Sequence, residues 1–354
     1  MPRPPARRTP RRTMYDGDHD PPAVYVVDDP RDLADQDSQF ANLDGLAIHY
    51  KHVASASSEA RDTIVMIHGF SGNTSNFTVT PVWQELHERY HLMAFDRPGW
   101  GLSPRVVRRR DRSWPTESGD NPYTYEYSAE LVERMLVHCH LMEEEEREGG
   151  RLVLLAHSHG GLLACYALSS RARLRAAFRG VVLVDAPILA WPVPRAAQSA
   201  AVRFPGLAKR LVHACAWMYA AGAKSPRLAG LTFGDIADYR QRYPNGMRGW
   251  DLTFRVRGWK ASFAEWCAAN AAAPPLHLER LQEVPILDVR GTRDRVISVR
   301  DGVECADATG AQTAFVAEAG HLPFAERPEE FMMVLDEFLN ALDTGMQDSV
   351  LLYE

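Results

Sequence analysis

The stretch 152–161 reads LVLLAHSHGG and joins a short apolar run to a serine that is flanked by small residues. Residues 162–168 continue as an apolar, helix-prone segment. Strand, tight turn, serine and helix in this order are typical of a nucleophile elbow, in which a strained turn lifts the serine hydroxyl above a sheet. Such a turn requires small neighbours, and Ala156 and Gly160 stand two positions before and after Ser158. The pattern therefore predicts that Ser158 is a nucleophile.

Apolar runs similar to the one before Ser158 recur at residues 63–67, 91–95, 181–184, 285–289 and 313–316. Unbroken apolar runs indicate strands that are buried on both faces of a parallel sheet. Helical periodicity separates several of them: one helix is expected over residues 128–142 and another from Pro328 onward. The dipeptide Asp44-Gly45 indicates a hairpin before the first run. The alternation predicts an α/β fold with a mostly parallel sheet flanked by helices.

Polar motifs follow four of these predicted strands. They are HGF at 68–70, DRPGWGLS at 96–103, GTRDRV at 291–296 and GHLPF at 320–324. Ligands of open α/β sheets bind beyond the carboxyl ends of the strands. We therefore expect the four motifs to gather around Ser158.

In their sequence order, the elbow and the four motifs make residues 40–342 resemble the α/β-hydrolase family of serine hydrolases. The chain departs from the family pattern G-x-S-x-G at Ala156 and carries a basic insertion at 105–112. The family order of nucleophile, acid and histidine implies a triad of Ser158, Asp294 and His321. Asp185, which follows the run 181–184, is an alternative acid because some members place the acid there.

The resemblance also implies a role for each residue. His321 would take the proton of the Ser158 hydroxyl, which is a weak nucleophile until a base activates it. Asp294 would hold the histidine in the correct tautomer and stabilise its cation. The backbone N–H groups of Phe70 and His159 would form an oxyanion hole, which stabilises the charge of the tetrahedral intermediate.

The chain is expected to divide into a tail at residues 1–37, a hydrolase core at 38–186 and 284–345, and a helical insertion at 187–283. The insertion is rich in alanine, arginine and tryptophan, the tryptophans being Trp191, Trp217, Trp250, Trp259 and Trp266. Its length and composition favour a helical cap over a structureless loop. A cap over the strand ends would exclude water and shape an apolar pocket.

The expected function is hydrolysis of an ester or related acyl bond through an acyl-enzyme, with a small to medium, partly apolar substrate. C–C bond hydrolysis, amide or iminopeptidase cleavage and haloperoxidase-like chemistry use the same residues and stay open. So does a hydrolase-fold binding protein without turnover, because a fold does not fix a function. No cofactor is expected. No metal is expected either, because His68, His157 and His159 lack the spacing of metal ligands.

Charge and composition limit the partners and the compartment. The net charge is −6, although the first 13 residues contain five arginines and no acid, so the remaining chain is acidic and argues against nucleic-acid binding. No apolar stretch reaches the roughly 20 residues of a membrane span, and no signal peptide is evident. Five scattered cysteines favour a reducing, cytoplasmic compartment. The basic N-terminus leaves organellar targeting open, and the sequence does not determine the oligomeric state.

Overall fold

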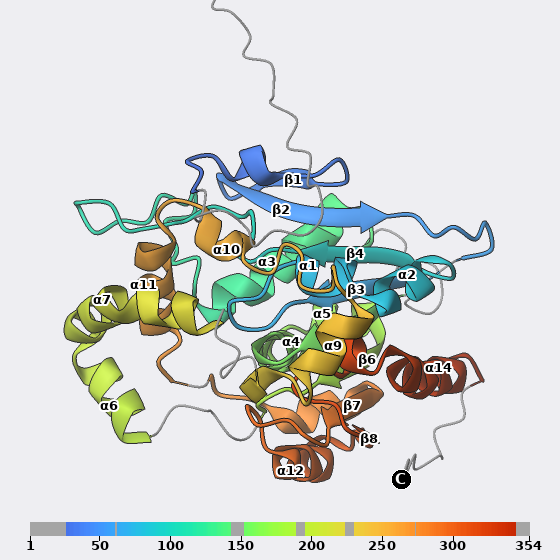
Figure 1. The fold of residues 1–354 in the computed structure, drawn as a ribbon. Helices are drawn as coiled ribbons and strands as arrows, with labels where there is room; N and C mark the ends of the chain where they lie inside the picture. Colours follow the sequence, from blue (N-terminus) through green and yellow to red (C-terminus); the bar gives the residue numbers. More distant parts are fainter. Residues whose placement is uncertain are drawn as a thin grey trace, which may run out of the picture.

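The computed structural model describes residues 26–60, 62–142, 152–188, 195–223, 230–272 and 274–344. Its centre is an eight-stranded sheet in the order β1-β2-β4-β3-β5-β6-β7-β8 (Figure 1). The strands are β1 (Gln39–Leu43), β2 (Leu46–Val53), β3 (Thr63–Ile67), β4 (His91–Phe95), β5 (Leu152–His157), β6 (Phe178–Val184), β7 (Ile286–Gly291) and β8 (Gln312–Val316). From β4 to β8 all neighbours pair in parallel, whereas β2 pairs antiparallel with both β1 and β4. The predicted α/β fold class is confirmed.

The hairpin between β1 and β2 follows from its turn residues. Asp44 and Gly45 have φ angles of 55° and 74°, and Leu43 pairs with Leu46. Positive φ at both central residues is the signature of a type I′ turn, whose twist matches that of the flanking strands. The predicted hairpin is confirmed.

Alternate residues of the parallel strands enter two hydrophobic cores, one on each face of the sheet. In β3, Val65 and Ile67 enter one core, while Ile64 and Met66 enter the other. The first core is closed by α3 (Tyr125–His138) and α4 (His159–Ser170), and the second by α2 (Pro81–His87) and α14 (Pro328–Thr344). Burial on both faces explains why these strands are apolar throughout.

Helix α3 differs from its predicted bounds of 128–142. The Thr124 hydroxyl accepts the N–H of Tyr127 at 3.2 Å and caps the helix three residues earlier than the apolar periodicity indicated. At the other end, His140 has a φ of 57°, which no α-helix accommodates. The start of α14 at Pro328 is as predicted.

The segment between β6 and β7 contains α6 (Arg195–Arg203), α7 (Pro205–Ala223), α9 (Ile236–Arg242), α10 (Leu252–Arg255) and α11 (Trp259–Ala269). Figure 1 shows α6 and α7 at the left, where α7 packs on α11. Whether this segment serves as a cap stays a prediction. The other helices are η1 (Pro30–Leu33), α1 (Ser75–Thr78), α5 (Ala172–Ala177), η3 (Leu278–Glu283), α12 (Val299–Thr309) and α13 (Pro323–Glu326).

The N-terminal segment packs on the body earlier than the expected tail boundary at residue 37. Val27 is buried, and its backbone bonds to Arg255 O at 2.9 Å and to Arg257 N at 2.8 Å. Residues 1–25, on which the targeting hypothesis depends, lie outside the described residues. Within the described residues, no helix is long and apolar enough to cross a membrane.

Gly291 provides a test of how closely the ends of β7 and β8 must pack. A Cβ at this position would lie 1.9 Å from Gly320 O and 2.6 Å from Ala319 O, both backbone atoms. We expect Gly291→Ala to lower the free energy of unfolding by about 2–3 kcal/mol, as overpacking does. Gly206→Ala is the control, because a Cβ there meets no atom within 4 Å. Urea unfolding that leaves both variants equally stable would contradict this packing argument.

Candidate active site

Ser158 occupies a strained turn between β5 and α4. Its φ and ψ are 53° and −126°, a conformation that non-glycine residues rarely adopt. The backbone N–H of Ser158 donates to Val184 O at 2.8 Å, which fixes the turn against β6. A Cβ on Gly160 would lie 2.5 Å from Ile67 O, so only glycine fits there. Ala156 lies on β5, which pairs with β3 on one side and with β6 on the other. It is fully buried, and its methyl group is accommodated.

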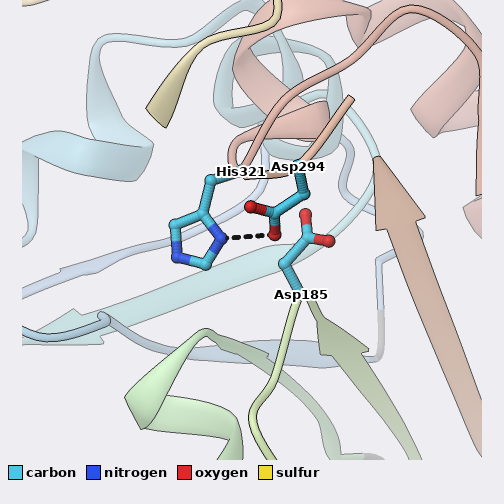
Figure 2. A group of neighbouring side chains, drawn as sticks. All are labelled: Asp185, Asp294 and His321. Atoms are coloured by element: carbon cyan, nitrogen blue, oxygen red, sulfur yellow. Dashed lines mark hydrogen bonds and ion pairs between the residues drawn. The ribbon is translucent and has the colours of Figure 1, made fainter. Parts of the chain in front are cut away.

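A chain of hydrogen bonds joins Ser158, His321 and Asp294. The distance from Ser158 Oγ to His321 Nε2 is 2.9 Å, and that from His321 Nδ1 to Asp294 Oδ2 is 2.7 Å (Figure 2 shows the second bond). A carboxylate only accepts, so Nδ1 carries the ring proton and Nε2 is the acceptor for the serine hydroxyl. The arrangement can therefore move a proton from Ser158 to His321.

Asp294 is held ionised by its neighbours. Burial raises the pKa of this carboxyl, but the hydrogen bond and charge of His321 outweigh it, so the net pKa is lowered. The N–H groups of Val296 and Ile297 donate to Asp294 Oδ1 at 2.6 and 3.1 Å. These bonds fix the carboxylate in the orientation that meets the imidazole.

Asp185, the alternative acid, lies beside Asp294 on the side away from His321 (Figure 2). Burial, followed by the charge of Asp294, raises the pKa of Asp185 well above its usual range. Its Oδ1 accepts the Gly291 N–H at 3.1 Å. The pKa directions indicate a protonated Asp185 beside an ionised Asp294, since two adjacent carboxylates avoid charging together. The geometry favours Asp294 as the partner of His321.

These three residues are also a potential metal-ligand group. One ligand atom from each of Asp185, Asp294 and His321 falls within 4.8 Å of the others. Both ring nitrogens of His321 are already hydrogen-bonded, so a cation would have to displace Asp294 or Ser158. The cluster therefore suits proton transfer better than metal binding.

The loop that carries His321 is held by residues whose roles the sequence did not reveal. Glu326 Oε1 accepts the N–H of Gly320 at 3.0 Å, and its Oε2 accepts that of Gly234 at 2.7 Å. His157 Nε2 donates to His321 O at 2.8 Å. Glu326 stands two residues after the motif at 320–324, but only the structure shows that it links this loop to the segment between β6 and β7.

The two expected oxyanion donors belong to segments that adjoin Ser158. His159 is the first residue of α4, where a helix dipole favours negative charge. Gly69, which precedes Phe70, packs so closely that a Cβ on it would lie 3.0 Å from Ser158 Cβ. The end of β3 therefore faces the nucleophile. The oxyanion-hole function of Phe70 and His159 stays a prediction.

The side chain of His159 is buried. Arg97 Nη1 donates to its Nδ1 at 2.9 Å, so Nε2 carries the proton and faces the Tyr125 hydroxyl at 3.1 Å. Burial, followed by the charge of Arg97, lowers the pKa of His159 well below its usual value, so the ring is neutral. Neither Arg97 nor Tyr125 was a candidate from the sequence, although Arg97 belongs to the motif at 96–103.

Aromatic rings surround the oxyanion residues. The Phe70 ring lies 4.8 Å from Trp266, 5.5 Å from Trp100 and 5.7 Å from Phe263. Trp266 also lies 4.8 Å from the His159 ring. Trp266 and Phe263 belong to α11, so the segment between β6 and β7 reaches the candidate site.

Asp96 organises the loop after β4. Its Oδ1 accepts the Thr74 N–H at 2.7 Å, and its Oδ2 accepts the Leu102 N–H at 2.7 Å and contacts His49 Nδ1 at 2.7 Å. These contacts join the start of the loop to Thr74, the residue before α1, and to His49 on β2. Asp96 itself is fully buried and makes no hydrogen bond to Ser158 or His321.

The sequence model described as "Alpha/beta hydrolase family" matches residues 64–333. No curated protein matches the chain. Among solved structures, a thermophilic esterase from Thermogutta terrifontis has a TM-score of 0.59 at 18% identity and covers 83% of this chain and 94% of its own.

Two further solved structures are similar. The enol-lactonase from Burkholderia xenovorans LB400 has a TM-score of 0.59 at 21% identity, with coverage of 85% of this chain and 100% of its own. A membrane phospholipase A, described as a bacterial virulence factor, has a TM-score of 0.57 at 22% identity, with coverage of 86% of both chains. At these identities the three structures show a shared fold.

The buried histidines should make the folded protein less stable in acid. Burial lowers the pKa of His68 and of His157 to about 3, so both are neutral in the folded protein. An unfolded histidine titrates near 6.5, so the stability is complete above that pH and declines as the pH falls toward 3. We expect these two histidines to lower the free energy of unfolding by roughly 2–3 kcal/mol when the pH falls from 7.5 to 5.5.

Urea unfolding at the two pH values measures this loss. His157→Asn should reduce the pH-dependent part by about 1 kcal/mol, whatever its effect at pH 7.5. His213→Asn is the control, because His213 is exposed. An unchanged pH dependence in His157→Asn would show that this histidine does not titrate as proposed.

Proposed function

The chain belongs to the α/β-hydrolase family, and on that premise we propose that it is a serine hydrolase that cleaves an ester or related acyl bond. The observation that carries this proposal is the hydrogen-bonded chain from Ser158 through His321 to Asp294. The nucleophile then contacts the base, and the base contacts the orienting acid, as acyl transfer requires.

In the proposed reaction, Ser158 Oγ attacks the acyl carbon while His321 Nε2 takes the hydroxyl proton. The tetrahedral intermediate collapses when the bond to the alcohol oxygen breaks, and His321 returns the proton to that oxygen. Water then attacks the acyl-enzyme with His321 again as base, which releases the acid and restores Ser158. Asp294 stabilises the imidazolium in both halves of the reaction.

The oxyanion of each intermediate would be bound by the backbone N–H groups of Phe70 and His159. Each such donor contributes about 3 kcal/mol in comparable hydrolases. The position of His159 at the N-terminus of α4 supports this role, because the helix dipole adds to the field of the N–H group.

The aromatic residues around Phe70 support a small to medium, partly apolar substrate. Trp100, Phe263 and Trp266 bring large apolar surfaces beside both oxyanion residues. We propose that residues 187–283 act as the cap, because α11 supplies two of these rings. The similar structures include an esterase, an enol-lactonase and a phospholipase A, which agree with an ester substrate, and also a bromoperoxidase, so haloperoxidase-type chemistry stays an alternative.

Ser158→Ala tests the nucleophile. Wild-type protein should react with a fluorophosphonate probe and hydrolyse p-nitrophenyl esters, with a preference along a panel of acyl chain lengths. Ser158→Ala should not label and should lose roughly 10⁶-fold in kcat, as other serine hydrolases do. Ser170→Ala is the control, because Ser170 ends α4 away from the turn. A wild-type protein that neither labels nor turns over any ester would instead favour the binding-protein alternative.

Asp294→Asn and Asp185→Asn separate the two candidate acids. Asparagine cannot stabilise the imidazolium, so Asp294→Asn should lower kcat about 10⁴-fold. Asn closely mimics a protonated carboxyl, so Asp185→Asn should stay within a few-fold of wild type. Ester hydrolysis measured for both variants decides the matter, and a larger loss in Asp185→Asn would assign the acid to Asp185.

A further inference from the structure

Arg97 is a buried cation that has no carboxylate partner among the described residues. It follows Asp96 at the end of β4 and is 2% exposed. Its guanidinium donates to three neutral acceptors: His68 O at 3.0 Å, Gly69 O at 2.9 Å and His159 Nδ1 at 2.9 Å. Among the described residues, no carboxylate oxygen lies within 4.0 Å of it. Burial lowers the pKa of Arg97 to about 10, so the group is still charged at neutral pH.

A buried charge of this kind destabilises the folded protein unless an interaction of the charge offsets the cost of desolvation. Buried charges in proteins are normally paired, because desolvation costs several kcal/mol. Arg290 shows the usual solution in this molecule: it is equally buried, and Asp288 Oδ2 lies 2.9 Å from its Nε. The unpaired charge of Arg97 therefore needs a separate explanation.

The hydrogen bond from Arg97 to Gly69 O affects the Phe70 N–H. Gly69 O and Phe70 N belong to the same peptide group, and a donor on the oxygen of a peptide strengthens its N–H as a donor. His68 adds a second donor to this oxygen: its Nε2 accepts the Arg97 N–H at 3.1 Å, so its Nδ1 carries the proton and donates to Gly69 O at 2.8 Å. The peptide is thus both oriented and polarised.

The hydrogen bond from Arg97 to His159 Nδ1 reaches the residue that carries the second expected oxyanion donor. Arg97 holds the imidazole of His159, the residue whose backbone N–H begins α4. The Tyr125 hydroxyl holds the far side of this ring at 3.1 Å. One guanidinium therefore links the end of β3, which carries Phe70, to the start of α4.

We propose that Arg97 is a positioning residue of the oxyanion hole, and that its missing counter-charge is the oxyanion formed during the reaction. The proposal rests on the proposed serine-hydrolase function. Arg97 acts on the substrate through the Gly69–Phe70 peptide and through His159. Its charge gains a partner only when the carbonyl oxygen of the substrate becomes negative, so it should lower the barrier without tightening substrate binding.

Arg97→Ala with chemical rescue tests the charge. We expect kcat for a p-nitrophenyl ester to fall about 10²–10³-fold, as on loss of an oxyanion donor, with KM changed only a few-fold. Guanidinium chloride at low, non-denaturing concentration should restore at least about 10-fold of kcat in the vacated site. Urea has nearly the same shape without the charge and should restore none. Rescue by urea to the same extent, or an unchanged kcat in Arg97→Ala, would overturn the proposal.

Arg105→Ala is the matched control, because Arg105 is a half-buried arginine of the same loop that donates to the backbone oxygens of Gly101 and Thr253. It should show no guanidinium rescue of kcat. If Arg97→Ala does not fold, Arg97→Met and Arg97→Lys replace it: both fill the site, and only lysine keeps the charge, so kcat should be higher in Arg97→Lys. Equal kcat in these two would reject the proposal.

The wild-type reaction separates the two levels of inference. A wild-type protein that neither labels with a fluorophosphonate nor hydrolyses esters refutes the serine-hydrolase function, and the role of Arg97 with it. An active wild-type protein whose Arg97 variants keep their kcat refutes the role of Arg97 alone.

Discussion

The strained backbone of Ser158 is the constraint on which the rest of the site depends. A φ of 53° at a non-glycine residue persists only if the surroundings hold it. They do so because Gly160 lets α4 approach the carbonyl oxygens of Ile67 and His68, and because Val184 O accepts the Ser158 N–H. The same close approach brings the end of β3 against the serine. The same packing contacts therefore fix the turn, the end of β3 and the start of α4 relative to one another.

The charges of the site are arranged asymmetrically around the serine. On the side of His321, Asp294 is ionised and Asp185 is protonated, which leaves a single negative charge beside the imidazole. Arg97 supplies a positive charge next to the neutral His68 and His159. Such a fixed field costs no reorganisation when charge develops in the transition state.

Much of the framework could be predicted from local patterns, because each motif follows a strand whose apolar run is unmistakable. The structure brings Ser158, Asp294 and His321 within hydrogen-bonding distance, although their catalytic roles stay predictions. What the sequence could not provide were contacts between distant segments. Arg97 meets His159 and Glu326 meets Gly234 only through the order of the strands, and no periodicity encodes such pairs. The start of α3 was missed because a capping threonine outweighed the apolar spacing.

The pairing of Val27 with the backbone around Val256 joins parts of the molecule that are remote in sequence. Asp35 anchors the same segment to the sheet, since its carboxylate lies 2.7 Å from Lys51 Nζ on β2. Residues 27–35 therefore form a strap from the antiparallel edge of the sheet to the entrance of α11, the helix that carries Trp266. A truncated protein that starts at the hydrolase core would lack this strap. The segment that leads into α11 would then lose the hydrogen bonds of Val27 to Arg255 and Arg257, and would keep those of Asn270 to Tyr123 and of Arg105 to Thr253.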